Sequence, residues 1–141
     1  MDKILKKDEQ AILLLRKLYQ AYGYQPYKMS RFEEYDLYVR NKDFLVSDQV
    51  ITFSDRSGKL LALKPDVTLS IIKNAGKSVD VQRVYYNENV YRVDPQTRAF
   101  REIMQTGLEC IGALSSTDVA EVVLLAAQSL SKLGGKFVLD I

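Results

Sequence analysis

Apolar side chains recur three and four positions apart in two long stretches of the chain, which is the spacing of an amphipathic helix. The first stretch covers residues 8–22 and is followed by Gly23, a residue type that often ends a helix. The second covers residues 115–133 and carries Asp118 and Glu121, three positions apart, as a capping signal. Both stretches predict helices that pack one face against a core.

Two shorter stretches also predict helical structure. Pro65 suits the first turn of a helix that ends at Gly76, because proline has no N–H group to leave unpaired there. Residues 31–40, "RFEEYDLYVR", predict a short helical or turn-like segment.

Other parts of the chain favour β-structure, because alternating or β-branched residues are bounded by turn residues. The segment "SDRSG" separates two such runs and predicts a hairpin, and "NEN" separates two more at an expected turn. The final "KFVLDI" also predicts a strand. The predicted strands are residues 50–54, 59–63, 79–86, 90–94, 101–110 and 136–141.

This order of elements predicts an α+β fold, in which an antiparallel sheet is flanked by helices on one side. The chain has 141 residues, 47% of them hydrophobic, which is enough for one core. No linker-like or repetitive segment divides it, so we expect residues 1–141 to belong to one domain. Because the chain stops within a predicted strand, we expect it to be the front part of a longer, here truncated, fold.

The composition excludes or disfavours several kinds of functional site and partner. The chain has no histidine, which removes the commonest general base and metal ligand, so we expect no histidine-based triad and no metal site. The single cysteine, Cys110, lies in a predicted strand and favours an unreactive thiol in a cytoplasmic protein. A net charge of +2 and the lack of a long apolar segment favour neither nucleic acid nor a membrane as partner. No cofactor is expected.

The stretch "REIMQTGLE", residues 101–109, carries an unusual set of polar side chains. In an extended strand Arg101, Gln105 and Glu109 share one face, with Gly107 between the last two. Gln105 and Glu109 could bind an ammonium or amide group close to the backbone at Gly107. The alternative is a bulge at Gly107 with two solvated polar side chains. The opposite face is apolar enough to belong to the core.

Two arginines form a second candidate site. The loop "PQTRAF" leads from the strand of Arg92 to the strand of Arg101, so their polar faces can combine. Paired guanidinium groups could hold a phosphate or a carboxylate. Alternatively, both arginines pair across the sheet with the acidic residues Asp94, Glu102 and Glu109. The spacing leaves both interpretations open.

Asp66 and Thr68, in "KPDVT", stand just before the predicted helix that ends at Gly76. There they could bind a ligand or simply cap the helix. A similar choice holds for the tyrosines: Tyr85, Tyr86 and Tyr91 could stack a base, although alternation in a strand favours core and cross-strand packing.

Two segments, "LLALKPDVTLSIIK" and "QRVYYNENVYRVDPQTRAFREIMQTGLECIG", resemble the class II synthetase-like catalytic domain of the histidyl-tRNA synthetase family. The resemblance runs over nearly the whole chain. It implies that the first segment contacts the amino acid and that the second is motif 2, whose strands and loop contact ATP and the amino acid.

The resemblance also implies residue roles. It places Arg92 at the ATP α-phosphate and makes Arg101 the second arginine beyond the loop. The implied histidine ligands are Asp66, Thr68, Gln105 and Glu109. The region that would hold motif 3 and the anticodon-binding domain lies outside this chain, so we expect the chain to catalyse nothing alone.

Departures from the synthetase pattern point to a related role. Lys64 and Asp66 replace the usual arginine and glutamate, Ser30 stands where motif 1 would carry proline, and the loop lacks the usual glycine-arginine-tyrosine run. The stretches "KPDVT" and "REIMQTGLE" are more similar to the paralogues that serve as regulatory subunit of ATP phosphoribosyltransferase in histidine biosynthesis. The implied partners are the short-form catalytic subunit and histidine, in a hetero-oligomer that contains a homodimer.

Two further hypotheses stay open. The chain is a fragment of an authentic histidyl-tRNA synthetase, in which case tRNA is also a partner, or it is a generic small-ligand domain that kept the fold but neither role. Detection of histidine-dependent pyrophosphate exchange by the parent protein would favour the synthetase.

Overall fold

The computed structural model describes residues 4–41, 49–76 and 80–141. They divide into two compact units, each made from segments that are separate in the sequence. The first unit comprises the described parts of residues 1–27, 77–87 and 106–141, and the second comprises those of residues 28–76 and 88–105. Two long strands, β5 (Gln82–Val93) and β6 (Phe100–Ile111), contribute to both units.

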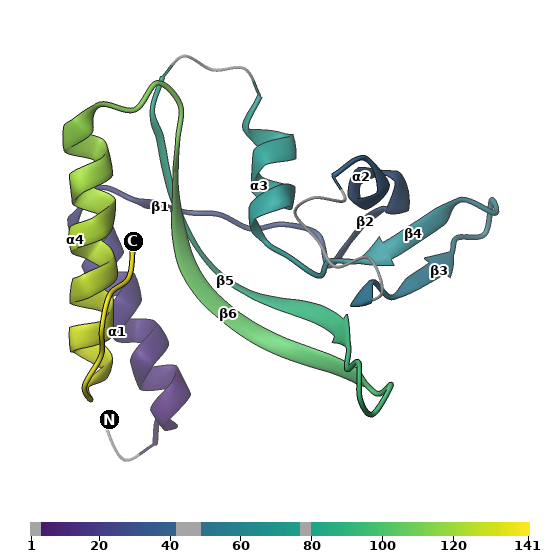
Figure 1. Cartoon of the computed structure of the whole chain (residues 1–141), viewed down its shortest axis with the longest axis horizontal. Helices are drawn as coiled ribbons and strands as arrows, with labels where there is room; N and C mark the ends of the chain where they lie inside the picture. Colours follow the sequence, from purple (N-terminus) through teal and green to yellow (C-terminus); the bar gives the residue numbers. More distant parts are fainter. Residues whose placement is uncertain (1–3, 42–48, 77–79) are drawn as a thin grey trace. The chain divides into compact units, whose positions relative to one another are not determined.

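Two helices and part of a sheet build the first unit. Helix α1 (Lys7–Ala21) lies beside helix α4 (Ser116–Leu133), and the short strand β1 (Gln25–Pro26) pairs in parallel with β5 (Figure 1). The two long helices are therefore confirmed, and Gly23 follows α1 with a φ of 83°. The buried cluster that joins these elements consists of Leu15, Tyr19, Tyr24, Tyr85 and Leu125.

The second unit contains a small antiparallel sheet in the order β2-β4-β3 and two short helices. Its elements are β2 (Phe32–Glu34), α2 (Tyr35–Arg40), β3 (Thr52–Ser54), β4 (Leu60–Leu63) and α3 (Thr68–Ala75). The predicted hairpin is thus confirmed as β3 and β4. Tyr38, Ala62 and Leu69 form the buried cluster of this unit.

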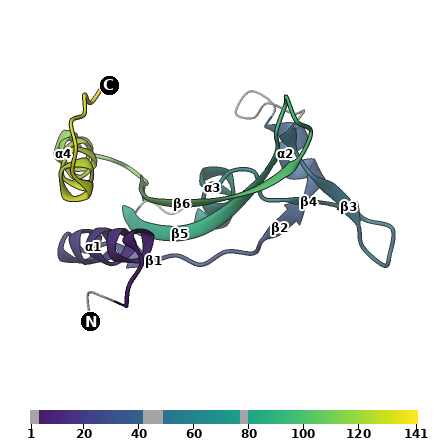
Figure 2. The same cartoon turned by 90° about the horizontal axis from the view of Figure 1, so that it is seen from below.

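The larger sheet has the order β1-β5-β6, and β5 and β6 run side by side as a long hairpin (Figure 2). Together with the second sheet and the helices this is the α+β class that the sequence predicts, apart from the parallel pairing of β1. The sequence-based assignment of residues 1–141 to one domain stays a prediction.

The predicted turn at "NEN" is wrong, because β5 continues without interruption through Asn87 and Asn89. Turn propensity is overridden by cross-strand bonds: the Thr106 hydroxyl donates to the Asn87 side chain at 3.0 Å, and the Asn89 amide donates to Glu102. The predicted strand start at Val79 lies outside the described residues.

Three other boundaries differ from the prediction. Residues 136–141 are exposed and form no strand, because a strand requires a neighbouring backbone to complete its hydrogen bonds. Helix α3 begins at Thr68 rather than Pro65. Helix α4 is capped by Ser115 and Asp118 rather than by Asp118 and Glu121: the Ser115 hydroxyl accepts from the Asp118 backbone N–H, and Asp118 accepts from Ser115.

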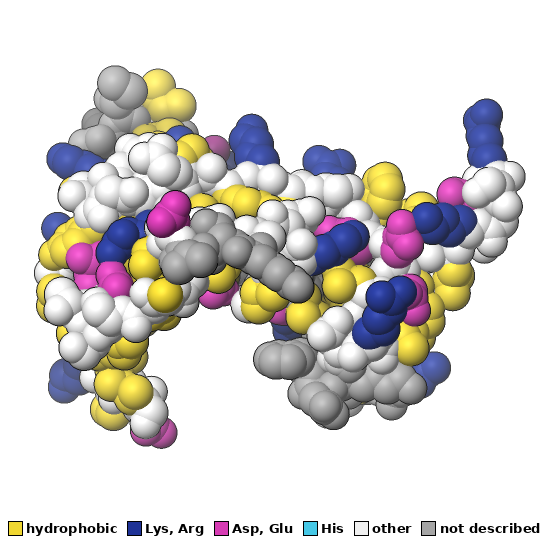
Figure 3. Space-filling view, turned by 90° about the horizontal axis from the view of Figure 1, so that it is seen from above, with side chains coloured by type: hydrophobic (Ala, Val, Ile, Leu, Met, Phe, Trp, Pro, Cys, Tyr) yellow, Lys and Arg dark blue, Asp and Glu magenta, His cyan; other side chains and the backbone are white. Residues whose placement is uncertain are grey.

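The described surface fits the near-neutral composition. On the face drawn in Figure 3, Lys and Arg side chains are interspersed with Asp and Glu side chains rather than gathered into one basic area. Among the described residues, no helix has the length and apolar character needed to cross a membrane.

Candidate functional site

The register of the β5–β6 hairpin decides which polar side chains face each other. At the turn, the Asp94 backbone N–H donates to the Ala99 carbonyl at 2.8 Å. Counting outward in an antiparallel pair places Asn87 opposite Thr106 and Tyr86 opposite Gly107. This register agrees with the hydrogen bond from Thr106 to Asn87 and with the close contact between Tyr86 and Gly107.

The same register gives the partners of the candidate site residues. Arg92 stands opposite Arg101, and Glu88 stands opposite Gln105. Because alternate residues share a face, Glu88, Arg92, Arg101 and Gln105 all belong to one face of the hairpin. The contacts of Thr106 and Gly107 fit a strand that continues through this glycine, and they give no sign of the predicted alternative, a bulge.

The segment "KPDVT" lies against this part of β5. The Tyr91 backbone N–H donates to the Lys64 carbonyl at 2.9 Å, and the Arg92 Nε donates to the Pro65 carbonyl at 3.0 Å. The Lys64 Nζ lies 3.3 Å from Oε2 of Glu88. Two separated segments of the sequence are therefore brought together within the second unit, next to the face that carries Gln105.

Asp66 and Thr68 follow directly in this segment, and both are half-buried. The Thr68 backbone N–H donates to Oδ1 of Asp66 at 3.3 Å. The N-cap position of α3 is Val67, and the helix has no side-chain cap hydrogen bond, so the Asp66 contact is a local turn before the helix rather than the cap that the sequence allowed. A role of either side chain in binding a ligand stays a prediction.

The two arginines already have acceptors within the chain. Besides the bond of Arg92 to Pro65, Arg101 lies 3.4 Å from Oδ2 of Asp94. The pKa of Asp94 is held below its usual value by the backbone N–H groups of Thr97 and Gln96, and the Arg101 charge adds to this effect. Pairing of Arg101 with Asp94 is one of the two arrangements that the sequence allows. Binding of an anion by Arg92 and Arg101 stays a prediction.

Gln105 and Glu109 are half-buried and share the face of Gly107. Gln105 belongs to the second unit together with Asp66, Thr68, Arg92 and Arg101, whereas Glu109 belongs to the first. The structure brings "KPDVT" and Arg92 together on the side of Gln105. The participation of Glu109 in the same site stays a prediction.

The opposite face of β6 is core only in part. Leu108 packs against the cluster of the first unit, whereas Met104 is 46% exposed and Glu102 is exposed. Cys110 is half-buried, and burial raises the pKa of its thiol. A raised thiol pKa agrees with the unreactive cysteine that the sequence favours.

The sequence did not indicate that Glu88 lies beside Lys64, because "NEN" predicted a turn. The available signal was the even spacing of Glu88 and Arg92, which places both on one strand face. Among the described residues, no group of three or more Asp, Glu or Cys side chains is arranged to hold a metal ion.

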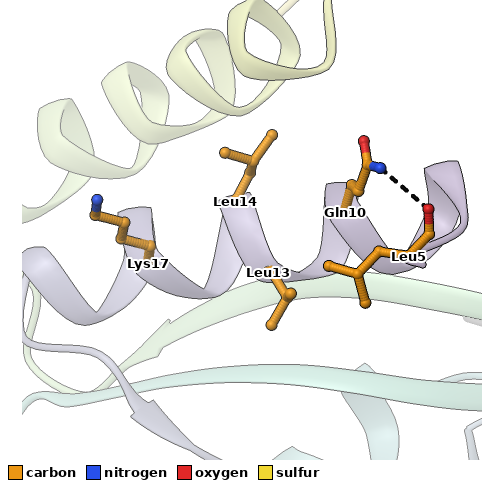
Figure 4. A pocket seen from close by; sticks show the side chains of 5 residues that line it. All are labelled: Leu5, Gln10, Leu13, Leu14 and Lys17. Atoms are coloured by element: carbon orange, nitrogen blue, oxygen red, sulfur yellow. Dashed lines mark hydrogen bonds between the residues drawn. The ribbon is translucent and has the colours of Figure 1, made fainter. Parts of the chain in front are cut away.

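A hollow along α1 is distinct from this polar face. It encloses about 300 Å³ and is lined by Leu5, Gln10, Leu13, Leu14 and Lys17 (Figure 4). The hydrogen bond drawn there, from the Gln10 side chain to the Leu5 carbonyl at 3.1 Å, is local. It contains none of the predicted site residues.

The fold defines the class of protein. The chain superimposes with a TM-score of 0.75 and 30% identity on the histidine–tRNA ligase subunit from Alicyclobacillus acidocaldarius, covering 92% of this chain and 38% of that one. This is a class II synthetase-like fold. Residues 3–141 match the family model described as histidyl-tRNA synthetase, so the chain belongs to the histidyl-tRNA synthetase family. The resemblance seen in the sequence is therefore confirmed.

Relatives in this family carry two different names. The histidine–tRNA ligase of Archaeoglobus fulgidus is 33% identical over 132 residues, which cover 90% of this chain and 32% of the relative. A protein of Halothermothrix orenii named ATP phosphoribosyltransferase regulatory subunit is 31% identical over 139 residues, 95% of this chain and 33% of the relative. The chain spans about a third of the length of these curated relatives.

Proposed function

We propose that the chain is the N-terminal part of a regulatory subunit of ATP phosphoribosyltransferase, which binds free histidine in a synthetase-like pocket. The single observation that carries this choice is that the cationic side chains at the site already have acceptors within the chain. Arg92 donates to the Pro65 carbonyl, Arg101 faces Asp94, and Lys64 faces Glu88. The charges of Arg101 and Lys64 are thus opposed by acidic side chains of the chain, and the Arg92 guanidinium, which a synthetase would direct at ATP, is held by a backbone carbonyl.

The choice fits the sequence departures. Lys64 and Asp66 stand where the synthetase pattern has arginine and glutamate, and a lysine cannot form the bidentate contacts of an arginine. The Halothermothrix orenii relative supports the same choice through its name. The proposed amino-acid ligands are Asp66, Thr68, Gln105 and Glu109.

In this proposal the chain has no catalytic activity of its own. Its partners are the short-form catalytic subunit of ATP phosphoribosyltransferase and histidine, within a hetero-oligomer that contains a homodimer, in the cytoplasm. The test is co-purification of the complete protein with that catalytic subunit, followed by measurement of phosphoribosyltransferase activity with and without histidine. Association and a change in histidine inhibition are expected. Failure to associate would overturn the proposal.

A second candidate is a fragment of a histidyl-tRNA synthetase. The observation in its favour is that Arg92, Arg101, Gln105 and Glu109 all stand at the positions that the family pattern requires. It predicts that the complete protein exchanges pyrophosphate into ATP only when histidine is present. The regulatory proposal predicts no exchange in the same assay, so one measurement separates the two candidates.

A further inference from the structure

Lys64 is a buried charged residue of the second unit. Its side chain is fully buried, and its Nζ lies 3.3 Å from Oε2 of Glu88. A buried ammonium without a counter-charge is strongly unfavourable, because it loses its hydration. Glu88 supplies the counter-charge for Lys64, and the contact with Lys64 in return fixes the position of the Glu88 carboxylate.

Glu88 faces the polar side of the hairpin. Its side chain is 17% exposed, so the carboxylate is neither fully enclosed nor free in solvent. The register places it directly opposite Gln105, and cross-strand neighbours have β-carbons about 4.5–5.5 Å apart. A carboxylate has two oxygens that each accept more than one hydrogen bond, so the contact with Lys64 leaves acceptor capacity.

We infer that Glu88 is a ligand residue of the amino-acid site, where its carboxylate, held by Lys64, accepts a hydrogen bond from the ammonium group of a free amino acid beside Gln105. This inference rests on the proposed function and adds to it a residue that selects the ligand's charge. A negative group at this place attracts an ammonium and repels a phosphate. At this position Glu88 therefore favours an ammonium group over a phosphate.

Calorimetry on the complete protein tests this inference, with histidine and ATP as separate probes. Glu88→Gln keeps the size of the side chain and removes its charge. We expect it to weaken histidine binding at least tenfold and to leave ATP binding unchanged or stronger. The matched control is Glu102→Gln, an exposed glutamate on the opposite face of β6, which we expect to leave histidine affinity within twofold.

A second variant separates ligand binding from folding, because Glu88→Gln alone leaves the buried Lys64 without its counter-charge. The double variant Lys64→Met with Glu88→Gln removes both charges and should regain the melting temperature that the single variant loses. We expect its histidine affinity to stay at least tenfold below that of the parent. Recovery of histidine binding in the double variant would mean that Glu88 only neutralises Lys64, and would overturn the inference.

Different results would contradict the proposed function and the role of Glu88. If the complete parent protein binds no histidine, the proposed function is wrong and this inference with it. If the parent binds histidine and Glu88→Gln binds it as well as Glu102→Gln does, only the inference is wrong.

Discussion

The Tyr86 side chain lies directly against the backbone of Gly107 on the neighbouring strand. A β-carbon added to Gly107 would lie 2.5 Å from the Tyr86 hydroxyl oxygen and 2.8 Å from the ring carbon that bears it. Both distances are shorter than real β-carbons allow. A β-carbon at position 107 would therefore displace the end of the Tyr86 ring, and both residues belong to the first unit.

Gly107→Ala should destabilise the protein by about 1–3 kcal/mol, the usual cost of inserting a methyl group into a filled site. Urea denaturation monitored by circular dichroism measures this. In the double variant Gly107→Ala with Tyr86→Ala the ring is absent, so we expect the alanine to cost much less there than in the parent background. A cost that is the same in both backgrounds would contradict the contact.

Replacement of Leu125 should be far more costly than replacement of its neighbour Leu124. Leu125 is fully buried in the cluster of the first unit, whereas Leu124 is 47% exposed on the other side of α4. Leu125→Ala should lower the free energy of unfolding by about 2–5 kcal/mol through lost burial and a residual cavity. Leu124→Ala is the matched control, and equal losses in the two variants would mean that α4 packs through a different face.

Ser115→Ala should weaken the start of α4 by about 1 kcal/mol, because the hydroxyl accepts a hydrogen bond from the Asp118 backbone N–H at 3.2 Å. Ser116→Ala, one position further into the helix, provides a matched loss of a hydroxyl. The midpoint of urea denaturation should fall for the first variant and hardly change for the second. The reverse order would place the cap at Ser116.

Asp118 should make stability depend on pH in the acid range. The backbone N–H and the hydroxyl of Ser115 lower the pKa of this carboxyl, and the nearby charge and hydrogen bond of Arg83 lower it further. The pKa of Asp118 in the folded state is then below its unfolded-state value of about 4. The contribution of this carboxylate to the free energy of unfolding is therefore complete above the unfolded-state value and is lost as the pH falls through the folded-state pKa. Asp118→Asn should remove this part of the acid dependence of the melting temperature. Asp140→Asn, in the exposed segment 136–141, should leave it in place.

Asp66 and Glu109 test the proposed amino-acid pocket. Replacement of either carboxylate by alanine should weaken histidine binding to the complete protein by about 1.5–3 kcal/mol if the carboxylate contacts the ammonium group. Isothermal titration calorimetry gives the affinities, with Glu102→Ala as the control on the opposite strand face. Unchanged affinity in Asp66→Ala would leave this residue with its local contact to the Thr68 backbone N–H alone.

The spacing of residue types along the chain predicted those helices and turns that depend on neighbouring residues of the sequence. The helical spacing that carries Leu15 and Tyr19 predicts α1, because burial of one face is what stabilises an amphipathic helix. The turn residues between β3 and β4 likewise predict their hairpin. The family, and with it the class of fold, was also recognisable from "LLALKPDVTLSIIK" and "QRVYYNENVYRVDPQTRAFREIMQTGLECIG".

What the sequence alone did not determine depends on contacts between distant segments. Glu88 looked like a turn residue, but β5 runs through it, because cross-strand bonds outweigh the turn preference of the adjacent asparagines. Lys64 looked only like a departure from a motif, and the fold buries it against Glu88, 24 positions away. Spacing within a strand fixes which side chains share a face. Only tertiary structure decides which segment is packed against that face, because that choice rests on burial and charge pairing across the fold.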